Sequence, residues 1–217
     1  MPRRKKVIRF VEIEPFPPVL GWRERIVGEA YKLGDRIDCD SIIPVRFCTR
    51  PGLGVYRKHC LTIVDPDFPE KSRQGLIILA GGEFGRGSAN ENAVWALASC
   101  GVRAVVAVTF ASTFRRNALN LGFFALTCPP LVKESEVGDQ IEIDLLEWQA
   151  HNHTQGFTFP LEELTPLEGD ILRAGGLIPY LNNLKGETTP PGKPPCALMF
   201  ANARSRKRSP DKENFPA

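Results

Sequence analysis

The chain has 217 residues, of which 42% are hydrophobic, and a formal net charge of +3 at pH 7. This length accommodates one domain with a proper core and is short for two domains of ordinary size. The six cysteines form no Cys-x-x-Cys pair, which indicates reduced thiols in an intracellular protein and argues against a disulfide framework or a zinc or cluster site in this chain.

Both ends of the chain are basic, whereas the body is not. Residues 1–9 and 202–217 hold ten of the 28 bases and two of the 25 acids, which leaves 18 bases and 23 acids in the rest. We therefore expect neither a basic binding face on the body nor a nucleic-acid partner. The composition predicts three parts: a basic, proline-containing extension over residues 1–26, a folded domain over residues 27–185, and a disordered basic tail over residues 186–217.

Neither a membrane anchor nor a leader peptide is indicated by the sequence. No apolar run approaches the length of a membrane span, and the first residues lack an apolar signal-peptide core. Glu12, Glu14 and the Pro15–Pro18 cluster interrupt any organelle-targeting helix. We expect a soluble cytoplasmic protein, with a mitochondrial location as the alternative.

Short apolar runs predict an α/β body. Residues 76–80 and 103–108 suit strands that are buried on both faces, and the apolar residues between them predict a helix. That helix should end near Cys100 and Gly101, because glycine suits a left-handed C-terminal cap. Residues 123–127 predict a third strand. The alternation of strand and helix implies parallel pairing with right-handed crossovers.

The remainder of the body predicts an antiparallel part and a closing helix. Residues 140–145 alternate between apolar and polar, as a half-exposed strand does, and residues 157–159 predict another short strand. His151 and His153 fall in the turn before it. This His-x-His pair could chelate a metal, but a polar turn is the simpler interpretation. Residues 169–184 predict one helix.

The glycine-rich stretch after the first buried strand is the most informative part of the chain. Gly85-Arg-Gly-Ser88 leads into the predicted helix, so the Ser88 hydroxyl would lie where backbone N–H groups and the helix dipole favour negative charge. A serine there can hold an anion or briefly be one. Alternatively, the glycines only permit a tight turn and Ser88 only caps the helix. A nucleotide loop is disfavoured, because the P-loop lysine and the third glycine of the dinucleotide fingerprint are absent.

This stretch resembles the swivelling-domain small subunits of the aconitase superfamily, above all those of 3-isopropylmalate dehydratase. Val106–Gly122 reads Val-Ala-Val-Thr-Phe-Ala-Ser-Thr-Phe-Arg-Arg-Asn-Ala-Leu-Asn-Leu-Gly, close to the family's Ile-Ala-x-Ser-Phe-Ala-x-Ile-Phe-x-x-Asn-x-x-Asn-x-Gly. Gly34–Pro44, Asp65–Phe68 and Ile171–Leu177 are similar to further family blocks in the same order, so the resemblance covers roughly residues 30–185. It implies an α/β swivelling domain of β/β/α barrel-like form.

The chain departs from the family inside the glycine-rich stretch. The family reads Gly-x-Gly-Ser-Ser-Arg-Glu-His, whereas Gly85–Asn92 reads Gly-Arg-Gly-Ser-Ala-Asn-Glu-Asn, so the second serine, the arginine and the histidine are lost. In the family the first serine is the base that exchanges a proton with a substrate carbon, and the arginine binds a substrate carboxylate. The resemblance therefore implies Ser88 as the catalytic base and leaves an uncharged residue, Asn90, at the carboxylate contact.

Substrate contacts are predicted from three segments. The loop after Ile-Ile-Pro sets substrate choice in the family, and arginine forks in the glycine-rich stretch and the second helix match carboxylates. Cys39, where the family usually has threonine, is interpreted as a small buried residue and not as a nucleophile. The candidate substrate-binding residues are Phe47, Arg50, Arg86, Gly87, Ala89, Asn90 and Arg116.

The resemblance implies one chain of a two-chain hydro-lyase that dehydrates and rehydrates a hydroxy di- or tricarboxylic acid, as in leucine biosynthesis. It implies no cofactor in this chain, and an iron-sulfur cluster on a large-subunit partner that acts as Lewis acid while the serine alkoxide acts as base. Two alternatives stay open. One is a non-catalytic paralogue that serves as scaffold or regulatory subunit, and the other is a nucleic-acid-linked role of the basic tails.

Overall fold

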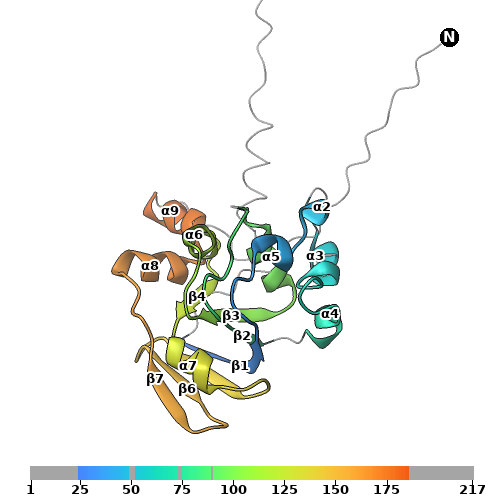
Figure 1. Ribbon diagram of the computed structural model, residues 1–217. Coiled ribbons are helices and arrows are strands. Elements are labelled where there is room, and N and C mark those ends of the chain that lie inside the picture. Colours follow the sequence, from blue (N-terminus) through green and yellow to red (C-terminus); the bar gives the residue numbers. More distant parts are fainter. Residues whose placement is uncertain (1–23, 49–51, 73–74, 89, 186–217) are drawn as a thin grey trace, which may run out of the picture.

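The computed structural model describes residues 24–185 except 49–51, 73–74 and 89 (Figure 1). The expected N-terminal extension therefore lies largely, and the expected C-terminal tail wholly, outside the described residues. Of the described helices, none is both long and apolar enough to cross a membrane.

A seven-stranded sheet in the order β4-β3-β2-β1-β5-β6-β7 forms the centre of the molecule. Neighbouring strands among β1 to β4 are parallel, whereas β5 is antiparallel to β1, β6 to β5 and β7 to β6. The strands are β1 (Arg25–Lys32), β2 (Leu76–Ala80), β3 (Val102–Ala107), β4 (Phe124–Thr127), β5 (Gln140–Asp144), β6 (Gln149–Asn152) and β7 (Phe157–Pro160). The predicted α/β class is confirmed, and each predicted strand is found within one residue of its expected ends.

Helices connect the strands and cover the sheet. In the described part they are α1 (Cys39–Ile42), α2 (Val45–Cys48), α3 (Leu53–His59), α4 (Phe68–Lys71), α5 (Asn92–Ser99), α6 (Ser112–Asn120), α7 (Pro129–Glu134), α8 (Pro166–Ala174) and α9 (Leu177–Leu184). Of the longer helices, α5, α6 and α8 bury apolar side chains, whereas α9 has no fully buried residue.

The parallel strands are apolar on both faces because both faces are covered. One face, which includes Ile78 and Val105, packs against α1 and α3 to α6. The other face, which includes Leu79 and Val106, packs against β5, β6, α7 and α8. In Figure 1 the sheet curls so that α7 lies beside β6 and β7, away from α3, α4 and α5. The molecule thus has two apolar cores separated by one layer of parallel strands.

β1 joins the parallel and antiparallel halves of the sheet. Residues 25–29 pair with β5, and residues 30–32 pair with β2. At Gly28 a Cβ atom would lie 1.7 Å from the Gly75 backbone oxygen, so only glycine fits where β1 passes the residue that precedes β2. β1 was not among the predicted strands.

Two sequence-based predictions are wrong in the C-terminal part of the body. The single helix expected over residues 169–184 is two helices, α8 and α9, separated by Gly175 (φ 85°) and Gly176 (φ 121°). These left-handed conformations suit glycine and end α8. His151 lies in β6 and not in a turn, and it pairs with Thr158 of β7. Only His153 lies in the connecting turn, where its Nε2 atom is 2.8 Å from Glu142 Oε2.

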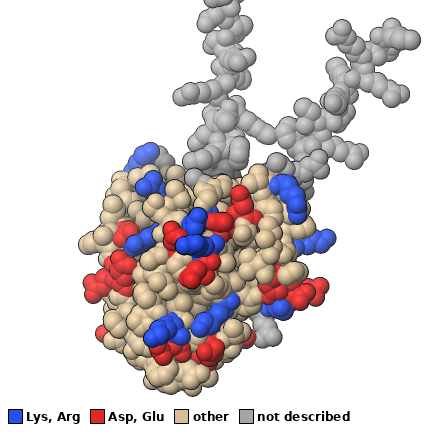
Figure 2. All heavy atoms as spheres, in the orientation of Figure 1, with Lys and Arg blue, Asp and Glu red and all other residues tan. Residues whose placement is uncertain are grey.

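Charged side chains of both signs are interspersed on the described surface. On the face that Figure 2 shows, Lys and Arg lie next to Asp and Glu, and no broad patch of one sign is visible among the described residues. This mixture matches the near balance of acids and bases between the two basic ends of the chain.

Substitution Gly28→Ala should destabilise the protein strongly. The added methyl group overlaps a backbone oxygen, so β1 or β2 must shift, and we expect the free energy of unfolding to fall by at least about 3 kcal/mol. Gly34→Ala is the matched control, because its Cβ would meet nothing within 4 Å, and a change of less than about 1 kcal/mol is expected. Urea denaturation measures both. Equal stability of the two variants would contradict the close crossing at Gly28.

Candidate active site

Three loops meet at one edge of the parallel half of the sheet. They follow the carboxyl ends of β1, β2 and β3, and ligands of open α/β sheets commonly bind at such an edge. Residues 81–88, here called the glycine loop, lie between the loop after β1 (residues 33–38) and the loop after β3 (residues 108–111). The glycine loop therefore occupies the middle of this edge.

The glycine loop is paired through its backbone with the loop after β1. The N–H of Gly85 donates to the Ile37 carbonyl at 2.7 Å, and the N–H of Cys39 donates to the Arg86 carbonyl at 2.8 Å. These bonds extend the parallel pairing of β1 and β2 beyond the ends of both strands. The position of residues 85 and 86 is thus set by the sheet.

On its other side the loop is fixed by the segment that leads into α6. The Phe84 N–H donates to the Thr109 carbonyl at 3.0 Å, and the Ala111 N–H donates to the Phe84 carbonyl at 2.9 Å. Gly85 has φ 78°, and a Cβ atom there would lie 2.3 Å from the Phe114 ring. A glycine is required at Gly85 both for its backbone conformation and for the packing of Phe114.

Ser88 is half-buried on the far end of the loop, so its hydroxyl is not sealed inside the core. The prediction that the loop leads straight into the helix is wrong: α5 begins at Asn92, with Glu91 as its N-cap residue. Ser88 therefore does not cap α5. Its Oγ instead accepts a hydrogen bond of 2.6 Å from the Asn90 side-chain amide. Gly87, at φ 85°, is exposed beside it.

The candidate arginines have different surroundings. Arg86 is about half exposed and lies 3.3 Å from a Glu83 carboxylate oxygen and 3.8 Å from one of Asp38. Arg116 is exposed on α6. Its neighbour Arg115 pairs with two glutamates, one before α8 and one in the first turn of α8. Arg115 is thus already paired with carboxylates of this chain.

Phe47 is held in a stack of side chains. Its ring lies parallel to the His59 ring, with 3.6 Å between centroids, and the Arg46 guanidinium is 4.8 Å from the Phe47 centroid. Burial, and after it the neighbouring charges of Lys58 and Arg46, lower the pKa of His59, so the ring that stacks on Phe47 is neutral at pH 7. Two further candidates, Arg50 and Ala89, lie outside the described residues.

Sequence reasoning missed several residues that shape this edge. Asp35 accepts the Gly82 N–H at 2.7 Å, and the Thr109 hydroxyl accepts the Glu83 N–H at 2.8 Å. The buried Tyr56 hydroxyl donates to the Asn92 side-chain oxygen at 2.7 Å. Asp35 and Thr109 lie in the blocks that carry the resemblance, and Asn92 replaces the histidine of the family pattern, whereas Tyr56 gave no signal in the sequence.

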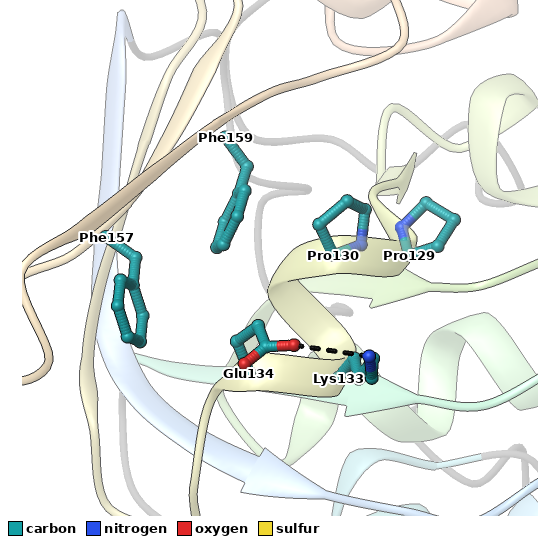
Figure 3. A pocket seen from close by; sticks show the side chains of 6 residues that line it. All are labelled: Pro129, Pro130, Lys133, Glu134, Phe157 and Phe159. Atoms are coloured by element: carbon teal, nitrogen blue, oxygen red, sulfur yellow. Dashed lines mark ion pairs between the residues drawn. The ribbon is translucent and has the colours of Figure 1, made fainter.

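A separate hollow of about 540 Å³ lies between α7 and β7. In Figure 3 two phenyl rings stand on the strand, facing two proline rings and a lysine–glutamate ion pair of 3.6 Å on the helix. None of the predicted site residues contributes to it, so the hollow is not assigned to the reaction. It is lined by Pro129, Pro130, Lys133, Glu134, Phe157 and Phe159. In the described part of the chain, no three His, Cys, Asp or Glu side chains are grouped to hold a metal.

Comparison with known proteins finds relatives that match the folded part of this chain over nearly their whole length. The model of the aconitase C-terminal domain matches residues 53–131. The 3-isopropylmalate dehydratase small subunit of Thermodesulfovibrio yellowstonii is 38% identical over 156 residues, which are 72% of this chain and 93% of that protein. The chain belongs to the 3-isopropylmalate dehydratase small-subunit family.

Two further members of the family agree. The small subunit of Pyrobaculum calidifontis is 40% identical over 158 residues, which are 73% of this chain and 98% of that protein. The crystal structure of 3-isopropylmalate dehydratase from Methanocaldococcus jannaschii matches with a TM-score of 0.71 at 35% identity, covering 82% of this chain and 99% of that one. The resemblance inferred from the motifs is confirmed, as is the fold that it implied.

Cys39 replaces the usual threonine of this family and is buried, as predicted. Its Sγ donates to the Gly85 carbonyl at 3.2 Å, so the buried thiol adds one hydrogen bond to the glycine loop. Burial, followed by the carboxylates of Asp40 and Asp38, raises the pKa of the Cys39 thiol to about 11. The thiol is therefore a poor nucleophile at neutral pH.

Alkylation with iodoacetamide at neutral pH should distinguish Cys39 from Cys48. The raised pKa of Cys39 lowers its thiolate fraction about 100-fold against an ordinary thiol. Burial raises the pKa of Cys48 as well, so the expected difference between the two rests chiefly on access, because Cys39 is fully buried. Peptide mass spectrometry should therefore show Cys48, which is only half-buried, labelled much faster in the native protein, and both labelled alike in denaturant. Native labelling of Cys39 as fast as that of Cys48 would contradict the buried-thiol assignment.

Proposed function

We propose that the chain is the small subunit of a hydro-lyase that dehydrates and rehydrates a hydroxy di- or tricarboxylic acid, in the manner of 3-isopropylmalate dehydratase. The observation that carries the proposal is the placement of Ser88. In a member of this family, Ser88 stands on a glycine loop whose backbone is bonded to the loops on both sides, and the residue is only half-buried. The names of the relatives favour this function over that of a non-catalytic paralogue.

Ser88 acts as the base in this proposal. Its oxygen would take the proton from a substrate carbon on dehydration and return it on hydration. A serine hydroxyl is a very weak acid, so donors must be in place to stabilise the ionised oxygen. The Asn90 amide is one such donor, at 2.6 Å from the Ser88 oxygen.

A large subunit is the proposed partner, because the relatives are named as small subunits. We assign the iron-sulfur cluster to that partner, where it would supply the Lewis acid for the leaving hydroxyl. The reported relatives come from bacteria and archaea, so a cytoplasmic complex is the simplest assignment.

Carboxylate recognition by this chain falls to the arginines and the loop backbone. Arg86 would exchange its surface pairings with two protein carboxylates for the substrate, since exposed ion pairs are weak. Arg116 and Arg50 are the further candidate cations, and Gly87 and Ala89 would contribute backbone contacts. Phe47, with one ring face stacked on His59, would contact an apolar part of the substrate.

Substitution Ser88→Ala tests the proposal. In the purified two-chain complex, assayed on malate, citrate and alkyl-malate substrates, kcat should fall by about 10³-fold or more because the base is removed. Ser99→Ala is the matched control: Ser99 is the last residue of α5, where its hydroxyl donates to the Ala96 carbonyl, so kcat should stay within about twofold. Both variants should unfold at nearly the wild-type temperature.

Two results would count against the proposal in different ways. Full activity of the Ser88→Ala complex would reject Ser88 as the base. A wild-type complex without activity on any of these acids would favour the scaffold alternative.

A further inference from the structure

A run of three hydrogen bonds connects the core to Ser88. The Tyr56 hydroxyl donates to Asn92 Oδ1 at 2.7 Å, the Asn92 backbone N–H donates to Asn90 Oδ1 at 3.1 Å, and Asn90 Nδ2 donates to Ser88 Oγ at 2.6 Å. Tyr56 is fully buried on α3, and Asn92 opens α5. The side chain of Asn90 therefore bridges the glycine loop and the first turn of a core helix.

The orientation of the Asn90 amide follows from its partners. A backbone N–H can only donate, so the end of the amide that faces Asn92 must be the oxygen. The end that faces Ser88 must then be the NH₂ group, which can only donate. The Ser88 oxygen is consequently an acceptor toward Asn90, and its own proton is left to point toward another group.

The inner end of the run is rigid. Tyr56 packs in the core between α3 and α5 with its side chain fully enclosed, so its hydroxyl has one fixed position. Its bond to the Asn92 side chain ties α3 to the first residue of α5. The buried Tyr56 therefore fixes the position of Asn92, and with it the backbone N–H that orients Asn90.

We infer that Asn90 is a positioning residue for Ser88, with Asn92 and Tyr56 holding it in place. This inference rests on the proposed function. The Asn90 N–H donates to the ionised Ser88 oxygen and stabilises it. When that oxygen takes the proton from the substrate carbon, the new O–H uses a different lone pair, so the Asn90 bond persists through the step. The electron pair of the broken C–H bond stays on the substrate.

Both ends of the Asn90 amide are engaged within this chain, so we assign Asn90 to Ser88 and not to the substrate carboxylate. Its oxygen is bonded to Asn92 and its nitrogen to Ser88. The position that carries a carboxylate-binding arginine in the family pattern serves the base in this chain. Loss of Asn90 should therefore act on kcat and leave KM nearly unchanged.

Substitution Asn90→Asp is the most direct test. The carboxylate can still accept from the Asn92 N–H, but it places an acceptor and a negative charge against Ser88 Oγ. Compared with the wild-type complex, the Asn90→Asp complex should have a kcat lower by about 100-fold or more and a KM within about threefold. The rising limb of its kcat–pH profile should lie at higher pH. Tyr56→Phe should lower kcat about three- to tenfold in the same way.

Tyr31→Phe is the matched control for Tyr56→Phe. The Tyr31 hydroxyl donates to Asp65, and neither residue belongs to the glycine loop or to the run of hydrogen bonds that ends at Ser88. The substitution therefore removes a tyrosine hydroxyl without changing that run, so stability should fall while kcat and the pH profile stay as in the wild type.

A second readout keeps the inference separate from the proposed function. Nuclear magnetic resonance of the full chain alone should show the Asn90 side-chain NH₂ resonances shifted and exchanging faster with solvent in Ser88→Ala. Unchanged Asn90 resonances in Ser88→Ala, or an Asn90→Asp complex that raises KM at wild-type kcat, would overturn the inference. An inactive wild-type complex would defeat the proposed function, while the resonance measurement would still decide the hydrogen bond.

Discussion

The glycine loop holds its shape because its backbone is paired with the loops on both sides. Residues 84–86 exchange hydrogen bonds with residues 37, 39, 109 and 111, as if the parallel sheet continued past its strands. Every other feature of the candidate site depends on this pairing. It presses Gly85 against Phe114, exposes Gly87, and leaves Ser88 at the one end of the loop that the sheet does not enclose.

The described arginine closest to Ser88 in the sequence is already paired. Arg86 shares its guanidinium between two protein carboxylates, and the residue two places after Ser88 is a neutral asparagine. The first turn of α5 begins too late to act on Ser88 directly. A neutral donor fixed from the core therefore takes the part that a free cation or a helix end would otherwise play.

The sequence predicted those elements whose pattern is local. The buried strands β2 and β3 and the left-handed Gly101 followed from apolar runs and a helix-ending glycine. The break between α8 and α9 was missed, because two apolar turns of helix on either side of a glycine pair look continuous. The bond from Tyr56 to Asn92 joins residues 36 apart, and no periodicity reports such a contact.

A structure of this chain bound to its large subunit and a hydroxy acid would decide whether Ser88 is the base. The distance to measure joins Ser88 Oγ to the substrate carbon that loses its proton. We predict about 3 to 3.5 Å, the separation of reacting atoms held ready for transfer, with Asn90 still donating to Ser88. A Ser88 oxygen turned away from the ligand, with another side chain nearest that carbon, would contradict it.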